Sequence, residues 1–221
     1  AALTANLALV PVADQLNAQE TASTRLQDVS AALRTQSRID DSTSEDVDIN
    51  RVVRESLTLV AGKTRVHTLV ESMANLPPAS CFRTRIGQVV TNLLSNAADA
   101  LSEKVDRERQ QGQLFLGKIR VETYPKNLEG IDGILIAVSD NGDGVPDAIR
   151  ERIFEDFFTT KPAGIGTGLG LSMCKTIIED HRGKLRVDRD PEFSGARFSV
   201  WIPVRFVQSD APASGLAPAS A

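Results

Sequence analysis

The apolar residues near the N-terminus follow the spacing of helices that pack against other helices. Two series alternate steps of four and three residues: Leu3, Leu7 and Val10, then Ala22, Leu26, Val29 and Leu33. This alternation is typical of a coiled-coil seam. Pro11 and the polar residues after it interrupt the run. We therefore predict a helical hairpin over residues 1–40, with its second arm over residues 17–39.

A two-helix hairpin cannot bury such a seam by itself. We expect it to pair with a second copy, which gives a four-helix bundle and a homodimer. The alternative is that the hairpin packs on the globular domain of its own chain. The next residues, D-S-T-S-E-D-V-D, are acidic and polar. We assign residues 41–48 to a linker.

From residue 49 onward, helical and strand patterns alternate. Helices are predicted over residues 50–59, 83–101, 146–154 and 169–181. Strands are predicted over residues 64–70, 117–124, 134–139, 184–188 and 196–204. Residues 102–112 are expected to form a loop, and residues 208–221 have the composition of a disordered tail. This order predicts an α/β (α+β) two-layer sandwich over residues 49–207, with a mixed or mostly antiparallel sheet covered by helices on one face.

Composition narrows the range of functions. Apolar residues make up 41% of the 221 residues and charged residues 24%, which is typical of a soluble, packed protein. The formal net charge of −4 argues against a broad nucleic-acid-binding face. No apolar run approaches the roughly 18 residues of a membrane span, and no basic segment opens a signal peptide. We expect a cytoplasmic region without membrane contact of its own, within a parent protein that can be membrane-anchored.

The sequence holds few soft metal ligands. Cys81 and Cys174 are isolated among apolar residues, and there are only two histidines. We interpret the cysteines as reduced packing residues. Any metal ion should therefore be held by oxygen ligands.

The predicted helix over residues 83–101 carries a polar stripe beside its apolar face. The apolar face is formed by Ile86, Val89, Val90, Leu93, Leu94, Ala97 and Leu101. The polar stripe is formed by Gln88, Asn92, Asn96 and Asp99, at steps of four, four and three. Amide oxygens can bind Mg²⁺ together with water and phosphate oxygens. The pattern alone is equally compatible with a solvated helix face.

A second candidate site comes directly after the predicted strand over residues 134–139. Asp140 is followed by the turn sequence N-G-D-G. Gly142 and Gly144 allow positive φ angles and a close approach of the backbone to a ligand. The Asp140 carboxylate can accept a hydrogen bond from an exocyclic amine such as that of adenine. The turn also resembles part of a calcium loop, but the downstream glutamate of an EF-hand is missing.

A glycine-rich segment, K-P-A-G-I-G-T-G-L-G-L-S, begins at Lys161 and leads into the predicted helix over residues 169–181. Its alternating glycines are Gly164, Gly166, Gly168 and Gly170. They expose backbone N–H groups beside a helix N-terminus, an arrangement that suits a triphosphate. The glycine spacing matches neither the dinucleotide fingerprint nor the P-loop.

Four segments, in this order, resemble one known family. N-L-L-S-N-A-A-D-A, D-N-G-D-G, F-E-D-F-F-T-T-K and G-I-G-T-G-L-G-L-S resemble the N box, first glycine box, F box and second glycine box of sensor histidine kinases. These kinases belong to the gyrase/histidine kinase/MutL ATPase superfamily. The later segment S-G-A-R-F-S-V-W-I-P is similar to the family's closing strand pair. The resemblance covers residues 50–205 and implies the Bergerat ATP-binding fold, with ATP and Mg²⁺ as cofactors.

The resemblance also implies a role for each matching residue. Asn96 is expected to be the principal Mg²⁺ ligand, with Asn92 lining the same metal site. Asp140 is expected to bind the adenine amino group, in a pocket shaped by Gly142 and Gly144.

The remaining expected nucleotide contacts lie in or beside a hinged lid over the phosphates: Lys161, Gly164, Gly166, Thr167, Gly168, Leu169 and Gly170. Lys161 and Thr167 are expected to contact phosphate. Lys161 is also expected, with Asn92 and Asn96, to support catalysis. The F-box residues Phe154, Phe157 and Phe158 are expected to pack the lid, although the same residues are compatible with simple core packing.

The residue at position 92 bears on the type of reaction. Gyrase-type relatives carry a water-activating glutamate there, whereas an asparagine cannot take a proton at neutral pH. The resemblance therefore implies a protein-histidine kinase whose phosphate is relayed to an aspartate of a response regulator. The alternatives are a module that phosphorylates a partner protein, a gyrase- or MutL-type ATPase switch, and an anti-sigma serine kinase.

Neither histidine fits the family's phosphoacceptor. His67 lies in a predicted strand, and His181 closes a predicted helix. We therefore expect that this chain cannot autophosphorylate by the usual route. The first residues, A-A-L-T-A-N-L, resemble the segment that the family carries just after its acceptor motif, so the chain is expected to begin just downstream of that motif. A natural chain without an acceptor is the alternative.

Overall fold

The computed structural model describes residues 44–161 and 166–205. The hairpin over residues 1–40, the tail over residues 208–221 and Gly164 lie outside these ranges, so their assignments stay predictions. None of the helices within the ranges combines the length and apolar character that a membrane span requires.

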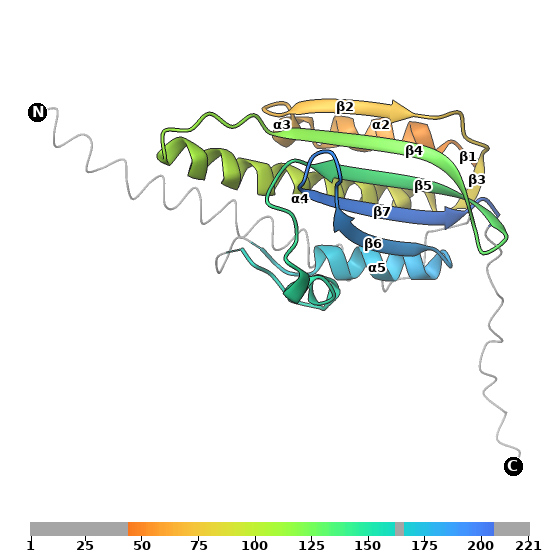
Figure 1. The fold of residues 1–221 in the computed structure, drawn as a ribbon. Coiled ribbons are helices and arrows are strands. Elements are labelled where there is room, and N and C mark those ends of the chain that lie inside the picture. The colour runs from red at the N-terminus through yellow and green to blue at the C-terminus, as the bar shows by residue number, and fades with distance from the viewer. Residues whose placement is uncertain (1–43, 162–165, 206–221) are drawn as a thin grey trace, which may run out of the picture.

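A five-stranded mixed sheet forms one layer of the molecule (Figure 1), with the strand order β2-β4-β5-β7-β6. Its strands are β2 (Thr68–Met73), β4 (Lys118–Leu128), β5 (Ile131–Asp140), β6 (Lys184–Arg189) and β7 (Ala196–Pro203). Strands β2 and β4 pair in parallel, and the other three pairs are antiparallel. The prediction of a mixed sheet is confirmed.

The second layer consists of helices on one face of this sheet (Figure 1). Its main helices are α2 (Ile49–Leu59), α4 (Arg83–Gln110) and α5 (Gly170–Asp180). All seven apolar positions predicted for α4 are buried, and they join one core with the buried side chains of β5 and α5. Burial of this apolar surface is the main stabilising contribution. The two-layer sandwich is therefore confirmed.

Helix α4 is longer than predicted. The charged residues 102–112 were expected to form a loop, but α4 continues to Gln110. Lys104 donates to the carbonyl oxygens of Asn141 and Gly142, each at 3.2 Å, and Arg107 lies 2.8 Å from an oxygen of Asp143. These contacts fix the last turns against the loop after β5. Lys, Arg and Glu are also good helix formers, so high charge alone did not indicate a loop.

Several short elements also differ from the prediction. Residues 44–47, which we assigned to a linker, form strand β1 (Ser44–Val47), which pairs with β3 (Ala79–Cys81). The reason is Val47, which is buried in the core despite its acidic neighbours. The strand predicted over residues 64–70 is confirmed only in its last three residues, because α3 (Ala61–Thr64) comes first and β2 begins at Thr68. The helix predicted over residues 146–154 is two 3₁₀ turns, η1 (Asp147–Ile149) and η2 (Arg152–Phe154).

Candidate functional site

A cleft of about 1710 Å³ is bordered by α4, the turn after β5 and the glycine-rich segment before α5. Most of the residues singled out from the sequence line it: Asn92, Asn96, Asp140, Gly144, Lys161, Gly166, Thr167, Gly168, Leu169 and Gly170. Gly142 lies directly behind Asp140 and donates its N–H to that carboxylate. The fold thus brings three separate sequence segments to one cavity.

The polar stripe of α4 faces this cleft. Asn92 and Asn96, one turn apart, both line it, while the apolar face of the helix lies in the core. The Asn92 amide nitrogen donates to the Cys174 sulfur at 3.3 Å. This bond uses Nδ2, so the amide oxygen of Asn92 can still act as a ligand. Two neutral amide oxygens suit Mg²⁺ when phosphate and water oxygens complete the coordination.

Gly170 places the start of α5 directly against Asn92. A Cβ atom at Gly170 would lie 2.6 Å from Nδ2 and 2.7 Å from Oδ1 of Asn92. Any larger residue would therefore displace the amide. The N-cap residue Leu169 makes no side-chain hydrogen bond to the helix. The first-turn N–H groups of α5 can thus face a phosphate.

Asp140 ends β5 as a buried carboxylate, 4% exposed. Its Oδ1 atom accepts hydrogen bonds from the backbone N–H of Gly142 at 2.8 Å and of Ala196 at 3.3 Å. Oδ2 takes part in neither bond, so it can accept one from an amino group in the cleft. Burial raises the pKa of Asp140, although the two backbone hydrogen bonds and Lys104 oppose that rise.

The glycines around Asp140 act in two different ways. Gly144 has a φ angle of +77°, which agrees with the left-handed conformation predicted there. Gly142 was expected to allow the same, but it is not among the positive-φ glycines. Its requirement is steric, because a Cβ atom would lie 2.8 Å from Oδ1 of Asp140.

Gly195 is a site residue that the sequence analysis missed. It lies in the turn between β6 and β7, where a Cβ atom would lie 2.2 Å from the carbonyl oxygen of Asp140 and 2.5 Å from Oδ1. The glycine of the closing strand pair was visible in S-G-A-R-F. Only the three-dimensional fold connects it with Asp140.

The F-box phenylalanines have different environments. Phe154 and Phe158 pack against the core, whereas Phe157 is 73% exposed. The backbone of Phe157 lies close to Gly168. A Cβ atom at Gly168 would lie 2.3 Å from the carbonyl carbon of Phe157. Gly168 also has a φ angle of +68°. The F box and the glycine-rich segment are therefore packed backbone to backbone.

Lys161 occupies the same side of the cleft as Asp99. Its Nζ atom donates to Oδ2 of Asp99 at 2.7 Å, and Lys63 donates to Oδ1 at 2.9 Å. Burial favours a higher pKa for Asp99, but the two lysines outweigh it and hold the pKa below its usual value. Sequence analysis missed Lys63, because an isolated lysine in A-G-K-T carries no pattern.

The histidines and cysteines lie outside the residues that line the cleft. His181 is fully buried: Nε2 accepts from the Phe82 N–H at 3.0 Å, and Nδ1 donates to the Ile177 carbonyl at 2.6 Å. Cys81 and Cys174 are free and buried, as predicted, and burial raises their pKa to about 11 and about 12.

His67 was predicted in a strand, but it lies in the bend before β2. Its Nε2 atom is 3.3 Å from the Ser102 hydroxyl. Within the described ranges, no group of three or more His, Cys, Asp or Glu side chains could hold a metal ion. The amide side chains of Asn92 and Asn96 line the cleft.

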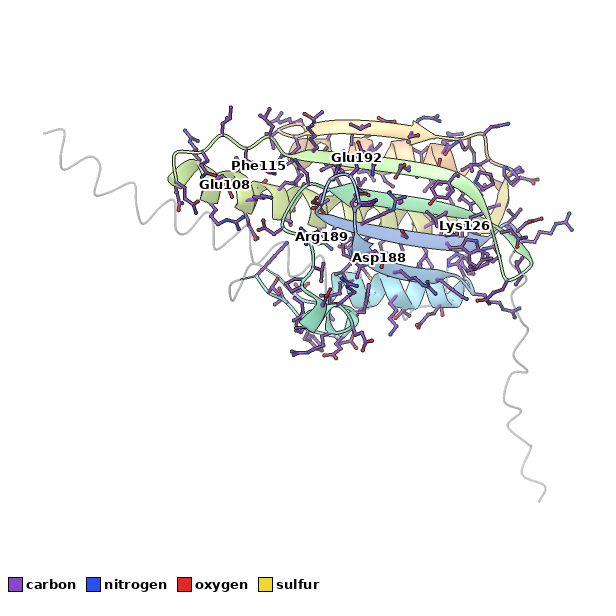
Figure 2. All side chains as sticks on the ribbon, in the orientation of Figure 1. Glu108, Phe115, Lys126, Asp188, Arg189 and Glu192 are labelled. Atoms are coloured by element: carbon purple, nitrogen blue, oxygen red, sulfur yellow. The ribbon has the colours of Figure 1, made fainter. Side chains whose placement is uncertain are left out.

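The helix-free face of the sheet carries charged side chains (Figure 2). The β6–β7 turn, which carries Glu192, lies over this face, and Arg120 of β4 forms ion pairs with Glu192 and, at 2.7 Å, with Asp190. Because the same turn carries Gly195, the charged cluster is connected to the Asp140 side of the cleft.

Comparison with known proteins gives consistent matches. The family described as "Histidine kinase-, DNA gyrase B-, and HSP90-like ATPase" matches residues 82–205. Signal transduction histidine-protein kinase AtoS of Escherichia coli (strain K12) is 35% identical over 165 residues, which cover 72% of this chain and 24% of AtoS. The chain thus spans about a quarter of the length of that relative.

Solved structures agree with these matches. The catalytic domain of histidine kinase ThkA is 31% identical, with a TM-score of 0.59 over 74% of this chain and 99% of that domain. A structure of ThkA in complex with response regulator protein TrrA is 27% identical, with a TM-score of 0.63 over 84% of this chain and 49% of that one.

Proposed function

Because this chain belongs to the histidine kinase-, DNA gyrase B- and HSP90-like ATPase family, and has the Bergerat fold of histidine kinase catalytic domains, we propose that it is the Mg-ATP-binding catalytic region of a sensor histidine kinase. It transfers the γ-phosphate to a histidine, from which the phosphate passes to a response-regulator aspartate. The observation that carries this proposal is the single cleft that collects Asn96, Asp140 and the glycine-rich segment.

The cleft has a polar group for each part of the nucleotide. Oδ2 of Asp140 accepts a hydrogen bond from the adenine amino group, because Oδ1 already accepts hydrogen bonds from two backbone N–H groups. The amide oxygens of Asn96 and Asn92 would hold Mg²⁺, and the bound ion would supply neutralisation of phosphate charge. Lys161 and the first-turn N–H groups of α5 receive phosphate oxygens.

Two features of α4 favour transfer over hydrolysis. Asn92 stands where a water-activating carboxylate would be needed, and its amide cannot accept a proton at neutral pH. Asp99, about two turns further along, is held by two lysines that lower its pKa, so it is a weak base. Positioning and charge neutralisation are then the main catalytic contributions of the pocket.

The acceptor histidine is proposed to lie on another polypeptide or domain. Both histidines of the chain lie within the described residues; His181 is fully buried, and neither lines the cleft. The partner proposed for the relay is a response-regulator receiver domain, and the ThkA–TrrA complex supports this class of partner. Homodimerisation through residues 1–40 stays a prediction.

The reaction can be tested by mixing the purified chain with radiolabelled ATP and a separate hairpin domain that contains the acceptor histidine. We expect acid-labile label on that histidine and little phosphate release without it. Steady phosphate release without an acceptor would instead identify an ATPase switch. Acid-stable label on a serine would identify a serine kinase.

Replacing the metal ligand tests the site directly. Asn96→Ala should abolish magnesium-dependent ATP binding in calorimetry while the circular dichroism spectrum stays unchanged, because Asn96 lies in the cleft rather than in the core. Asn127→Ala is a matched control, since Asn127 bonds Asp132 in the β4–β5 hairpin. Undiminished transfer by Asn96→Ala would remove Asn96 from this role.

A further inference from the structure

One carboxylate joins two lysines that come from distant parts of the chain. Asp99 projects from α4, Lys63 from α3, and Lys161 from the end of the F box. Each oxygen of Asp99 accepts from one lysine, at 2.9 Å from Lys63 and 2.7 Å from Lys161. Lys63 also donates to the Ser95 hydroxyl at 2.9 Å.

This triad borders the metal ligands. Asp99 lies three residues after Asn96 and therefore on the same helix face. All three members of the triad line the cleft together with Asn92 and Asn96. The side chains of Asp99 and Lys161 are 28% and 24% exposed, so the pair is only partly screened by solvent.

The triad keeps both charge and donors for a ligand. Two ammonium groups and one carboxylate leave a net positive charge. An ammonium group has three N–H donors. Lys63 uses two of them, for Asp99 and Ser95, and Lys161 uses one, for Asp99. Each lysine therefore keeps at least one donor for a phosphate oxygen, and charge-assisted hydrogen bonds of this kind are strong.

We propose that Lys63, Asp99 and Lys161 form a phosphate clamp. In this clamp Lys63 is a second cationic contact for the phosphates of the nucleotide, and Asp99 is a positioning residue that fixes both ammonium groups. The clamp rests on the proposed function, because its ligand is the polyphosphate of Mg-ATP. The competing explanation is an ion pair that only attaches α3 to α4 and contributes little.

Nucleotides of different phosphate length separate these explanations. Calorimetry with adenosine, ADP and Mg-ATP is performed on the unmodified chain and on Lys63→Gln. We expect Lys63→Gln to weaken Mg-ATP binding by about 10-fold, equivalent to about 1.4 kcal/mol, and to leave adenosine binding within about twofold, because adenosine has no charge for the clamp to bind.

A second lysine provides the matched control. Lys184 forms a similar ion pair with Glu129, at 2.6 Å, but both residues lie outside the cleft lining. Lys184→Gln should bind all three ligands as the unmodified chain does. Equal Mg-ATP affinity in Lys63→Gln and Lys184→Gln would overturn the clamp.

The sign of the Asp99 effect tests its positioning role. If Asp99 acted only through its charge, Asp99→Asn would strengthen binding of the anionic nucleotide. If Asp99 positions the lysines, the same change weakens Mg-ATP binding, and Asp99→Glu, which keeps the charge, restores part of it. Thermal unfolding of each variant establishes that the fold is retained. If Asp99→Asn does not fold, the Mg-ATP affinity of Lys63→Gln decides whether the clamp exists.

The outcomes also distinguish the clamp from the proposed function. Normal adenosine binding with tighter Mg-ATP binding in Asp99→Asn would refute the positioning role alone. An unmodified, folded chain that binds neither adenosine nor Mg-ATP would overturn the proposed function itself.

Discussion

Replacing Asp140 by asparagine would test the proposed role of Asp140 in recognising adenine. The change is nearly isosteric. The asparagine carbonyl oxygen can still accept the hydrogen bonds that Oδ1 receives from the N–H groups of Gly142 and Ala196. Only the second oxygen changes, from an acceptor to an NH₂ donor. The turn after β5 should therefore keep its conformation while the group that meets adenine is reversed.

The expected loss of affinity comes from this single contact. A hydrogen bond to a charged acceptor contributes about 1.5–3 kcal/mol, and in Asp140→Asn an NH₂ group would face the adenine amino group. We expect ATP affinity to fall by roughly 10- to 150-fold. GTP carries a carbonyl where adenine has its amino group, so GTP affinity should fall less or rise.

Although Asp140→Asn should lower ATP affinity, it should increase the stability of the fold. Burial raises the pKa of Asp140 above its usual value. The folded state therefore holds the proton at pH values where the unfolded chain has released it. That contribution to stability is present below the usual aspartate pKa of about 4 and is lost as the pH rises through the raised pKa. Asp140→Asn removes this loss and should increase the melting temperature at pH 7.

Two measurements check the reasoning. Calorimetry with ATP and GTP gives the selectivity, and thermal unfolding between pH 4 and pH 8 gives the stability. Asp132→Asn is the control, because Asp132 is an exposed aspartate in the β4–β5 hairpin. Unchanged ATP affinity in Asp140→Asn, or equal ATP and GTP affinities in the unmodified chain, would refute the assignment of Asp140 to adenine.

The packing of the site leads to three other predictions. Gly170→Ala should weaken Mg-ATP binding at least about 10-fold in calorimetry, because its methyl group would displace the Asn92 amide. Gly62→Ala is the control and should bind normally, because a Cβ atom there meets nothing within 4 Å. His181→Ala should lower the free energy of unfolding in urea by about 2–4 kcal/mol, since it removes a buried acceptor and donor; a smaller change would contradict its structural role. Cys81 and Cys174, whose pKa burial raises to about 11 and about 12, should react with a thiol reagent at pH 8 only after unfolding, and fast labelling of the folded chain would disprove this.

Local patterns were sufficient where a segment is buried on one side along its whole length. The apolar positions of α4 recur with the helical period, and all seven predicted core positions are buried. Residues 134–138 of β5 form a continuous apolar run, and this strand lies in the middle of the sheet. The motif residues also line one cleft, although Asn92 and Asn96 lie in the middle of α4. Asp140 ends β5, and Gly170 begins α5.

Local patterns failed where a distant contact decides the structure. Lys104 and Arg107 hold the last turns of α4 against the loop after β5. No local pattern in the sequence predicts these contacts. Strand β1 depends on one buried valine in an acidic segment. Lys63 reaches the cleft only because α3 packs beside α4. In each case the deciding partner is distant in the chain.

The position of Asp140 also depends on a charge on the other face of the sheet. Asp190 is 1% exposed and accepts hydrogen bonds from two backbone N–H groups of the β6–β7 turn, while Arg120 donates to it at 2.7 Å. Burial alone would raise the pKa of Asp190, but these bonds together hold it well below its usual range. The ionised carboxylate thus fixes the turn that carries Gly195 and Ala196. Since the N–H of Ala196 donates to Oδ1 of Asp140, this turn helps to hold the carboxylate that we propose to bind adenine.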